Sequence, residues 1–255
     1  MRGLGVSGPA GTSCFGLAGF SVQDGATLRL DAASVRNCTE IGMFVGFPSF
    51  LPFGPVVGQA AVIGTDITGT RIAGIRAAGP GTTLTVSASK VLLPYAPEVD
   101  GQVGISIVDG ALGNVTGSTV SGGICDHPAC GPDFLTQLQG TGLLALGAAP
   151  GTVISQNLIT NNDIGIAVGF SVDCCRVSQN TLRDNRYYGI AVADGRQTIS
   201  STTVTGGLVG VVSVSFDAPT TATLDQVVIT GAATPVQELS CCGFPSTVEG
   251  SYFIR

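Results

Sequence analysis

The chain has little of what a helical or α/β enzyme usually contains. Its 255 residues include no tryptophan, two methionines, one histidine and one lysine, and only 11% of them are charged. The net charge of −6 leaves no basic patch to neutralise phosphates, so we expect no nucleic-acid partner. No apolar run approaches the roughly 20 residues that cross a bilayer, which argues against a membrane span.

No signal peptide is visible at the start of the sequence, while cysteine is plentiful. The opening residues, "MRGLGVSGPAGTSC", lack the charged and apolar regions of a signal peptide. Eight cysteines nevertheless favour an oxidising compartment. We therefore expect a mature or excised part of a secreted or cell-surface protein, of the bacterial extracytoplasmic kind.

What the chain does have is 38 glycines, together with many Ser, Thr, Val and Ile residues. These residues suit short strands and tight turns better than long helices. A glycine followed by apolar residues recurs at intervals of 23, 24 and 21 residues from Gly142 through Gly165 and Gly189 to Gly210. A repeat of this size holds about three short strands, which is one coil of a parallel β-helix. Leucine-rich repeats are the alternative, but their regular leucine positions are missing.

The predicted fold is all-β: a right-handed parallel β-helix of about eight to nine coils, with repeat coils over about residues 14–240 of a single domain, 1–255. Each coil pairs with the next, so apolar residues stack into a continuous core and small polar residues form ladders at the turns. The core candidates are Ile166, Val168, Ile190, Val192 and Val211.

The cadence "N-x-I-x-x-N-x-x-G-I" at 157–166, with a looser copy at 180–190, resembles right-handed β-helix proteins of the pectate-lyase-like superfamily. The resemblance implies the fold but no single reaction, because that superfamily holds polysaccharide lyases, glycoside hydrolases, epimerases, adhesins and accessory proteins. A polygalacturonase-like carboxylate motif and a pectate-lyase calcium signature are both missing. No catalytic residue is therefore carried over.

Three insertions lengthen the repeat, at 46–59, 93–102 and 125–140. The second and third precede the strand glycine on adjacent coils, so we expect them to leave the same corner. Loops on a rigid scaffold are where function concentrates. The residues expected to gather at that corner are Tyr95, Glu98, Asp100, Asp126, His127, Asp133, Asp163, Asp184, Arg186 and Tyr187.

This corner predicts glycosidic chemistry. Asp163 and Asp184, on neighbouring coils, are the candidate catalytic pair, one acting as acid and the other as base or nucleophile. The substrate-binding candidates are Arg186, Tyr187, Tyr95, Asp100 and Glu98. Arginine would hold an acidic sugar, and tyrosines would stack on sugar faces. The alternative is that each Asp is a solvated turn residue, and the lack of tryptophan weakens a sugar platform.

His127 lies within Cys125-Asp126-His127-Pro128-Ala129-Cys130, which predicts a disulfide-closed loop. A zinc site is the alternative, but it would need a fourth ligand. His127 is also a candidate catalytic acid or base. A second bridge is predicted between Cys14 and Cys38. No cofactor is expected, since no pattern supports calcium or zinc.

The apolar insertion 46–59 is either an exposed flap or, as we favour, a cap over one end of the β-helix. A bare end is an open strand edge, so self-association through uncapped ends is also expected.

Two functional classes remain. One is a secreted carbohydrate-active protein, a hydrolase or lyase that acts on a polysaccharide or cell-surface glycan in the corner groove. The other is a non-catalytic structural, adhesive or partner-binding rod. Two irregular insertions side by side favour the first class.

Overall fold

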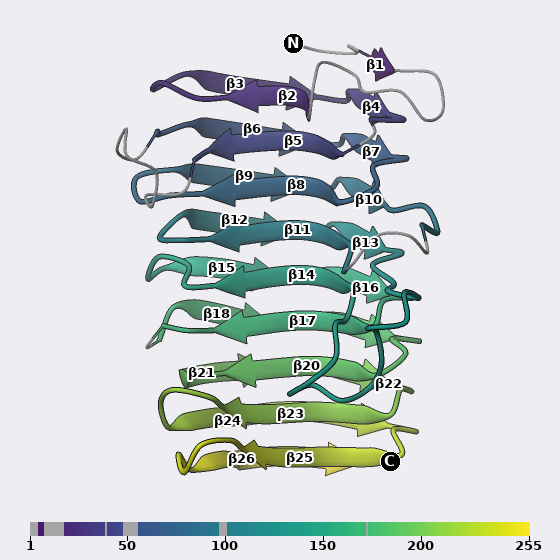
Figure 1. The fold of residues 1–255 in the computed structure, drawn as a ribbon, viewed down its shortest axis with the longest axis vertical. Coiled ribbons are helices and arrows are strands. Elements are labelled where there is room, and N and C mark those ends of the chain that lie inside the picture. Colours follow the sequence, from purple (N-terminus) through teal and green to yellow (C-terminus); the bar gives the residue numbers. More distant parts are fainter. Residues whose placement is uncertain (1–4, 8–17, 39, 48–55, 97–100, 172) are drawn as a thin grey trace.

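The chain winds into a parallel β-helix whose coils stack in sequence order from one end to the other (Figure 1). The computed structural model describes residues 5–7, 18–38, 40–47, 56–96, 101–171 and 173–255. Within these ranges every element is a strand, and every pairing between strands is parallel. The prediction of an all-β parallel β-helix is confirmed.

One face of each coil belongs to a nine-stranded sheet, here called the front sheet, so the stack has nine coils. Its strands are β2 (Ala18–Val22), β5 (Ile41–Gly46), β8 (Ala73–Ala78), β11 (Val103–Val108), β14 (Thr141–Leu146), β17 (Ile164–Gly169), β20 (Tyr188–Ala193), β23 (Val209–Ser215) and β25 (Thr234–Ser240).

The rest of each coil contributes to a seventeen-stranded sheet, here called the rear sheet. Its longer strands are β3 (Thr27–Asp31), β6 (Gln59–Ile63), β9 (Thr83–Ser87), β12 (Leu112–Thr116), β15 (Thr152–Ser155), β18 (Cys175–Ser178), β21 (Gly195–Ser200), β24 (Thr220–Thr230) and β26 (Ser246–Ile254). Its three-residue strands are β1 (Gly5–Ser7), β4 (Ser34–Arg36), β7 (Asp66–Thr68), β10 (Lys90–Leu92), β13 (Thr119–Ser121), β16 (Leu158–Thr160), β19 (Thr181–Arg183) and β22 (Thr203–Thr205).

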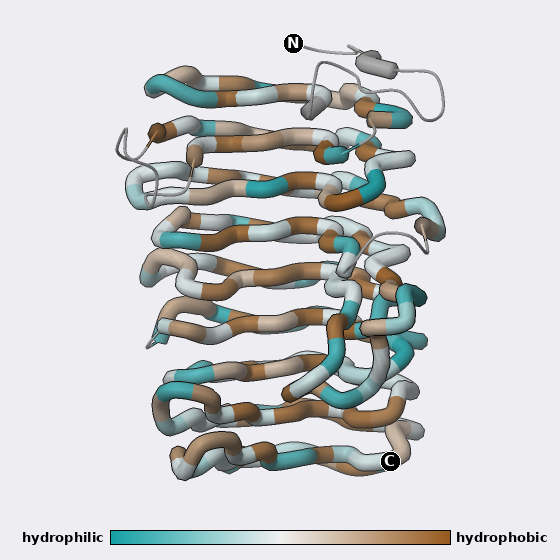
Figure 2. Tube along the Cα trace, viewed as in Figure 1, coloured by the Kyte–Doolittle hydropathy of each residue, from teal (hydrophilic) through white to brown (hydrophobic). Residues whose placement is uncertain are grey.

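The core is a column of stacked aliphatic side chains. Ile166 lies opposite Ile190, which lies opposite Val211, and all three have no exposed surface. Val168 and Val192 form the next pair in register and are equally buried. The hydrophobic residues run along the strands, while hydrophilic residues gather at the turns (Figure 2). These five core predictions are confirmed.

A ladder of buried polar side chains fixes the corner between the two faces of the rear sheet. Ser118 N–H donates to Asn157 Oδ1 at 3.0 Å, and Asn157 N–H donates to Asn180 Oδ1 at 3.0 Å. Asn157 Nδ2 also donates to the carbonyl of Val115 at 2.9 Å. The preceding residue, Gln156, has a φ of 59°, which turns the chain at this corner. Because buried amides are costly unless paired, the ladder holds each coil in register.

The insertions leave two different corners. Residues 93–102 connect β10 to β11, and residues 125–140 connect β13 to β14, which is the same corner on adjacent coils. Residues 46–59 instead connect β5 to β6, where Phe47 N–H donates to the Val56 carbonyl at 2.8 Å. Residues 48–55 and 97–100 lie outside the described ranges, so a capping role for 46–59 stays a prediction.

The last coil uses one of its own side chains on its open edge. The N–H of Val248 in β26 donates to Oε1 of Glu238 in β25 at 2.8 Å. A charged side chain placed on a strand edge disfavours pairing with another chain. Self-association through the ends of the β-helix stays a prediction, and the position of Glu238 at this end argues against it.

Candidate functional site

The insertion 125–140, hereafter the flap, folds back over the outer surface of the front sheet, passing in front of β17 and β20 (Figure 1). The ring of Phe134 meets the ring of Tyr188 edge to face, with centroids 5.4 Å apart. The Tyr188 hydroxyl donates to the carbonyl of Pro132. These contacts hold the tip of the flap two coils away from its point of origin.

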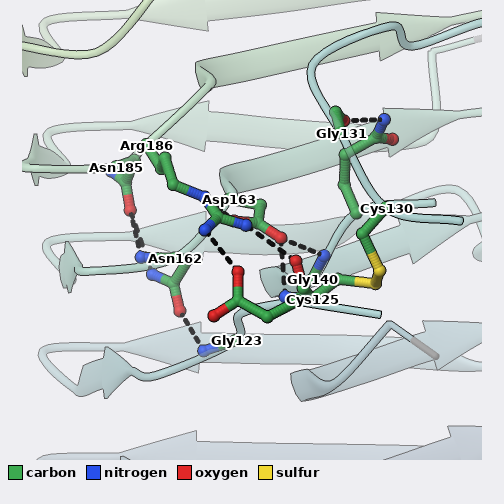
Figure 3. Close-up of polar contacts among 11 residues, drawn as sticks. Gly123, Cys125, Cys130, Gly131, Gly140, Asn162, Asp163, Asn185 and Arg186 are labelled. Atoms are coloured by element: carbon green, nitrogen blue, oxygen red, sulfur yellow. Dashed lines mark hydrogen bonds and ion pairs between the residues drawn. A yellow bond between two sulfur atoms is a disulfide. The ribbon is translucent and has the colours of Figure 1, made fainter. Parts of the chain in front are cut away.

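The base of the flap is held by one buried carboxylate. The backbone N–H groups of Cys125 and Gly140, at the two ends of the flap, both donate to Asp163 Oδ2 at 2.8 Å (Figure 3). Asp163 lies directly before β17, and its side chain has no exposed surface. One carboxylate thus ties both ends of the loop to the next coil.

Arg186, one coil further on, completes this network. Its Nε lies 2.8 Å from Asp163 Oδ1, an ion pair in which that oxygen accepts no hydrogen bond of good geometry. Its Nη1 donates to Asp126 Oδ1 at 2.6 Å, and its Nη2 donates to the Cys125 carbonyl at 2.7 Å. The guanidinium also lies over the ring of Tyr187, 4.6 Å from the centroid. A planar guanidinium suits several acceptors at once in a way that an ammonium does not.

The two carboxylates of the network have opposite pKa shifts. Burial raises the pKa of Asp163 above its ordinary value, although the N–H groups of Gly140 and Cys125 and the charge of Arg186 act in the other direction. The hydrogen bond from Arg186 holds the pKa of Asp126 below its ordinary value, and a hydrogen bond from Tyr95 adds to this effect. Asp126 is partly solvated, with 31% of its side chain exposed, so water as well as Arg186 stabilises its ionised form.

The structure brings five of the predicted corner residues together: Tyr95, Asp126, Asp163, Arg186 and Tyr187. It does not bring the predicted catalytic pair into one site. Asp184 is exposed at a turn with a φ of 56°, and its N–H donates to the Thr205 carbonyl. The pairing of β16 with β19 places Asn161, not Asp163, at the equivalent position of the previous coil. Asp163 pairs with Arg186 instead, because the two side chains meet at the flap base.

A catalytic role for Asp163 and Asp184 stays a prediction, and the arrangement of Asp163 opposes it. A general acid or nucleophile must reach the reacting atoms, whereas Asp163 is fully buried and already occupied by three groups of the protein. Glu98 and Asp100 lie outside the described residues, so their substrate-binding roles also stay predictions. Asp133 closes a turn within the flap, where its Oδ2 accepts the Thr136 hydroxyl at 2.6 Å.

The cysteine loop at the start of the flap is closed by a disulfide between Cys125 and Cys130, the pairing that its sequence suggests. His127 lies inside this loop, and its Nδ1 accepts the Ala129 N–H at 3.3 Å. A catalytic role for His127 stays a prediction. Cys38 is disulfide-bonded, but Cys14 lies outside the described residues, so that pairing also stays a prediction.

An apolar groove of about 260 Å³ between the flap and the front sheet was not expected from the sequence. Its lining includes Phe134, Leu138, Leu144, Ala167, Phe170 and Phe216. Leu144 and Ala167 stand in register on β14 and β17 and point away from the core. Apolar residues at outward-facing strand positions are the signal that would have revealed this covered surface.

Residues suited to a metal site do not come together in the described part of the chain: no group of three or more His, Cys, Asp or Glu side chains is placed to hold an ion. The described ranges also contain no helix long and apolar enough to cross a membrane.

The comparisons with known proteins give one match. A family model described as "Periplasmic copper-binding protein (NosD)" matches residues 63–217, which is more than half of the chain. The matched range runs through the coils from β7 to β23 and includes the flap with its Asp163 and Arg186 anchors. Neither the comparison with curated proteins nor that with solved structures gives a match. The chain belongs to the NosD family.

Proposed function

We propose that this protein is an extracytoplasmic, non-catalytic β-helix protein that binds an apolar partner segment in the groove beneath its flap. The family description, which names a periplasmic protein, supports the location. One observation carries the proposal: the charged corner residues are used to hold the flap in place, while the surface that the flap partly encloses is apolar. The corner is therefore an anchor, and the groove is the binding surface.

The groove has the composition of a binding site for apolar groups. In register along its floor are Leu144, Ala167 and Ala191, on β14, β17 and β20. The flap supplies Phe134 and Leu138, and the Leu138 side chain keeps 46% of its surface exposed. A concave, mostly apolar surface with an exposed rim is typical of ligand and partner sites.

A carbohydrate-active function receives less support from this geometry. Hydrolysis or elimination needs accessible acid and base groups flanking the scissile bond, and the candidate Asp163 is buried in an ion pair. The groove also offers a polysaccharide or glycan few hydrogen-bonding side chains, since Gln137, Gln139 and Thr141 are the polar residues of a mostly apolar lining. A closer relation to the pectate-lyase-like superfamily stays a proposal about the fold and adds no reaction.

Copper is named in the family description, but the described side chains do not fit a copper site. His127 already accepts a hydrogen bond on Nδ1, and its neighbours Cys125 and Cys130 are joined to each other. A protein copper site draws on several imidazole, thiolate or thioether ligands. Cys241 and Cys242 are free thiols, but among the described residues no third His, Cys, Asp or Glu is placed with them, and Met43 is fully buried in the core. We therefore route no step of the proposed function through copper.

Binding of 8-anilinonaphthalene-1-sulfonate, a fluorescent apolar probe, tests the groove. Leu138→Asp places a charge on the rim and should weaken binding by on the order of tenfold. Leu112→Asp is the matched control, since Leu112 is similarly exposed (39% against 46%) but lies on β12 of the rear sheet. Equal binding by both variants would contradict the groove. A parallel screen with chromogenic glycosides and polysaccharides should show no turnover, and turnover that disappears in Asp184→Asn would restore the enzymatic hypothesis.

A further inference from the structure

Two pairs of adjacent cysteines lie at the same corner of the β-helix, where the chain passes from the front sheet to the rear sheet. Cys174 precedes β18 and Cys175 is the first residue of that strand, so this pair follows β17. Cys241 and Cys242 lie in the turn between β25 and β26. The first pair is joined by a disulfide and is buried, with exposed fractions of 1% and 6%. The second pair is free, and Cys242 is exposed to solvent. The chain thus carries one sequestered pair and one accessible pair of the same kind.

We propose that Cys241 and Cys242 form a redox-active pair that closes to a disulfide between adjacent residues by exchange with a small-molecule disulfide. The joined Cys174–Cys175 pair supports this, because the same chain already closes such a ring at an equivalent corner. The accessible pair is therefore a modification site, and disulfides of the glutathione class are its reactants.

The turn that carries the pair has room to change shape. Cys241 N–H donates to the Ser215 carbonyl at 2.9 Å, and Phe244 N–H donates to the Cys241 carbonyl at 3.3 Å, so the turn is held at its ends. Gly243, between them, has a φ of +88°, and a Cβ added there would meet no atom within 4 Å. The turn is thus tied to Ser215 of the previous coil at Cys241 and Phe244 and has open space around Gly243.

Cys242 is the thiol expected to react first. A hydrogen bond with Cys242 raises the pKa of Cys241, which lowers its thiolate fraction. Cys242 is also the more exposed of the two. Its thiolate attacks one sulfur of the small disulfide, forms a mixed disulfide and releases one small-molecule thiolate. The Cys241 thiolate then attacks Sγ of Cys242 and releases the second. Two electrons pass from the protein pair to the small disulfide, and the two thiol protons leave with the released thiols.

Mass mapping of the tryptic fragment tests the proposal. Trypsin cleaves after Arg196, and the fragment 197–255 contains Cys241 and Cys242 as its only cysteines, whereas Cys174 and Cys175 fall in the fragment 91–176. The folded protein is reduced under native conditions, freed of reductant and then treated with oxidised glutathione. Fragment 197–255 should lose about 2 Da and resist alkylation. Fragment 91–176 also contains the Cys125–Cys130 disulfide of the flap, so the control is read at Cys174 and Cys175 alone. These two residues should stay joined and unalkylated through both steps, because the pair is buried.

Single variants separate closure from simple thiol modification. Cys241→Ser and Cys242→Ser should each stop at a mixed disulfide with glutathione, and Cys241→Ser should form it faster. Thermal unfolding confirms that each variant is folded. The proposal is overturned if wild-type fragment 197–255 remains doubly alkylated after oxidation, carries glutathione on both cysteines, or forms a covalent dimer instead of an internal bond.

Discussion

The guanidinium of Arg186 reaches back one coil to Asp163, and its Nε lies 2.8 Å from the carboxylate Oδ1. The other oxygen of that carboxylate accepts the N–H groups at both ends of the flap. Removing one partner of such a buried arrangement leaves the remaining groups unpaired, which costs more than the pair itself contributes. The position of the flap, and with it the shape of the groove, therefore depends on these two side chains.

Replacing Asp163 should loosen the flap. Asp163→Ala leaves the buried N–H groups of Cys125 and Gly140 without an acceptor, so the free energy of unfolding should fall by about 2–4 kcal/mol. Urea denaturation measures this loss, and chymotrypsin should cut faster at Phe134 in the variant. Asp184→Asn, a change at an exposed turn, is the control and should alter stability by less than about 0.5 kcal/mol. Equal stability and equal cleavage of both variants would show that Asp163 is not the anchor.

The geometry of Arg186 matters more than its charge. Arg186→Lys keeps the positive charge but cannot serve Asp163, Asp126 and the Cys125 carbonyl together. We expect a loss of about 1–2 kcal/mol in unfolding free energy and faster amide hydrogen exchange at both ends of the flap. Exchange in the core strand β20 should stay unchanged. Exchange that rises uniformly in both places would instead indicate a general loss of stability.

Stability should depend on pH through Asp126. Because Arg186 lowers the pKa of Asp126 in the folded chain, the unfolded chain binds more protons between that pKa and the ordinary Asp value. The contribution of Asp126 is therefore fully present above the ordinary value and is lost as the pH falls through the lowered one. The wild type should exceed Asp126→Asn by less than about 1 kcal/mol near neutral pH, since the pair is solvated. This difference should vanish in acid.

A double-mutant cycle checks the origin of that dependence. In an Arg186→Gln background, Asp126→Asn should no longer change the pH profile of the unfolding free energy, because the charge that lowers the pKa is gone. A difference that survives in this background would assign the effect to a group other than Arg186.

Substitutions in the asparagine ladder should lower the free energy of unfolding only at its buried positions. Asn157→Ala removes the acceptor of Ser118 N–H and the donor to the Val115 carbonyl, so we expect a loss of about 2–4 kcal/mol in urea denaturation. The matched control is Gln156→Asn, one residue earlier, where the side chain is exposed and Asn tolerates the positive φ. It should change stability by less than about 0.5 kcal/mol. If both variants lost a similar amount of unfolding free energy, the buried asparagine would contribute no more to stability than the exposed turn residue beside it.

The repeat length and the core were predictable from the sequence alone. Glycines followed by apolar residues return once per coil, and like residues then stack in register, as Ile166, Ile190 and Val211 do. Stacking requires only the right residue at the right interval, which is a local property of the chain. The corner at which 93–102 and 125–140 leave followed from the same intervals, because each insertion lies just before the strand glycine.

The partner of Asp163 could not be predicted in this way. Asn162 donates its N–H and its Nδ2 to Asn185 Oδ1 one coil on, as a ladder of turn residues would. The chain, however, holds one residue more between Asn185 and Tyr188 than between Asn162 and Ile164. That extra residue directs Arg186 toward Asp163 and leaves Asp184 at an exposed turn opposite Asn161. A shift of one residue reverses which way side chains point, and the glycine spacing alone does not say where the shift falls.

The groove was decided by contacts between residues far apart in the chain. Phe134 in the flap packs near Phe216, with ring centroids 6.2 Å apart, although three coils of sequence separate them. The sequence by itself determined the coil, because hydrogen bonding between neighbouring repeats depends on a local period. Only the tertiary structure decided what the corner does. Asp163 is buried and the front sheet is covered because the flap folds across later coils, and no local sequence pattern in those coils predicts these contacts.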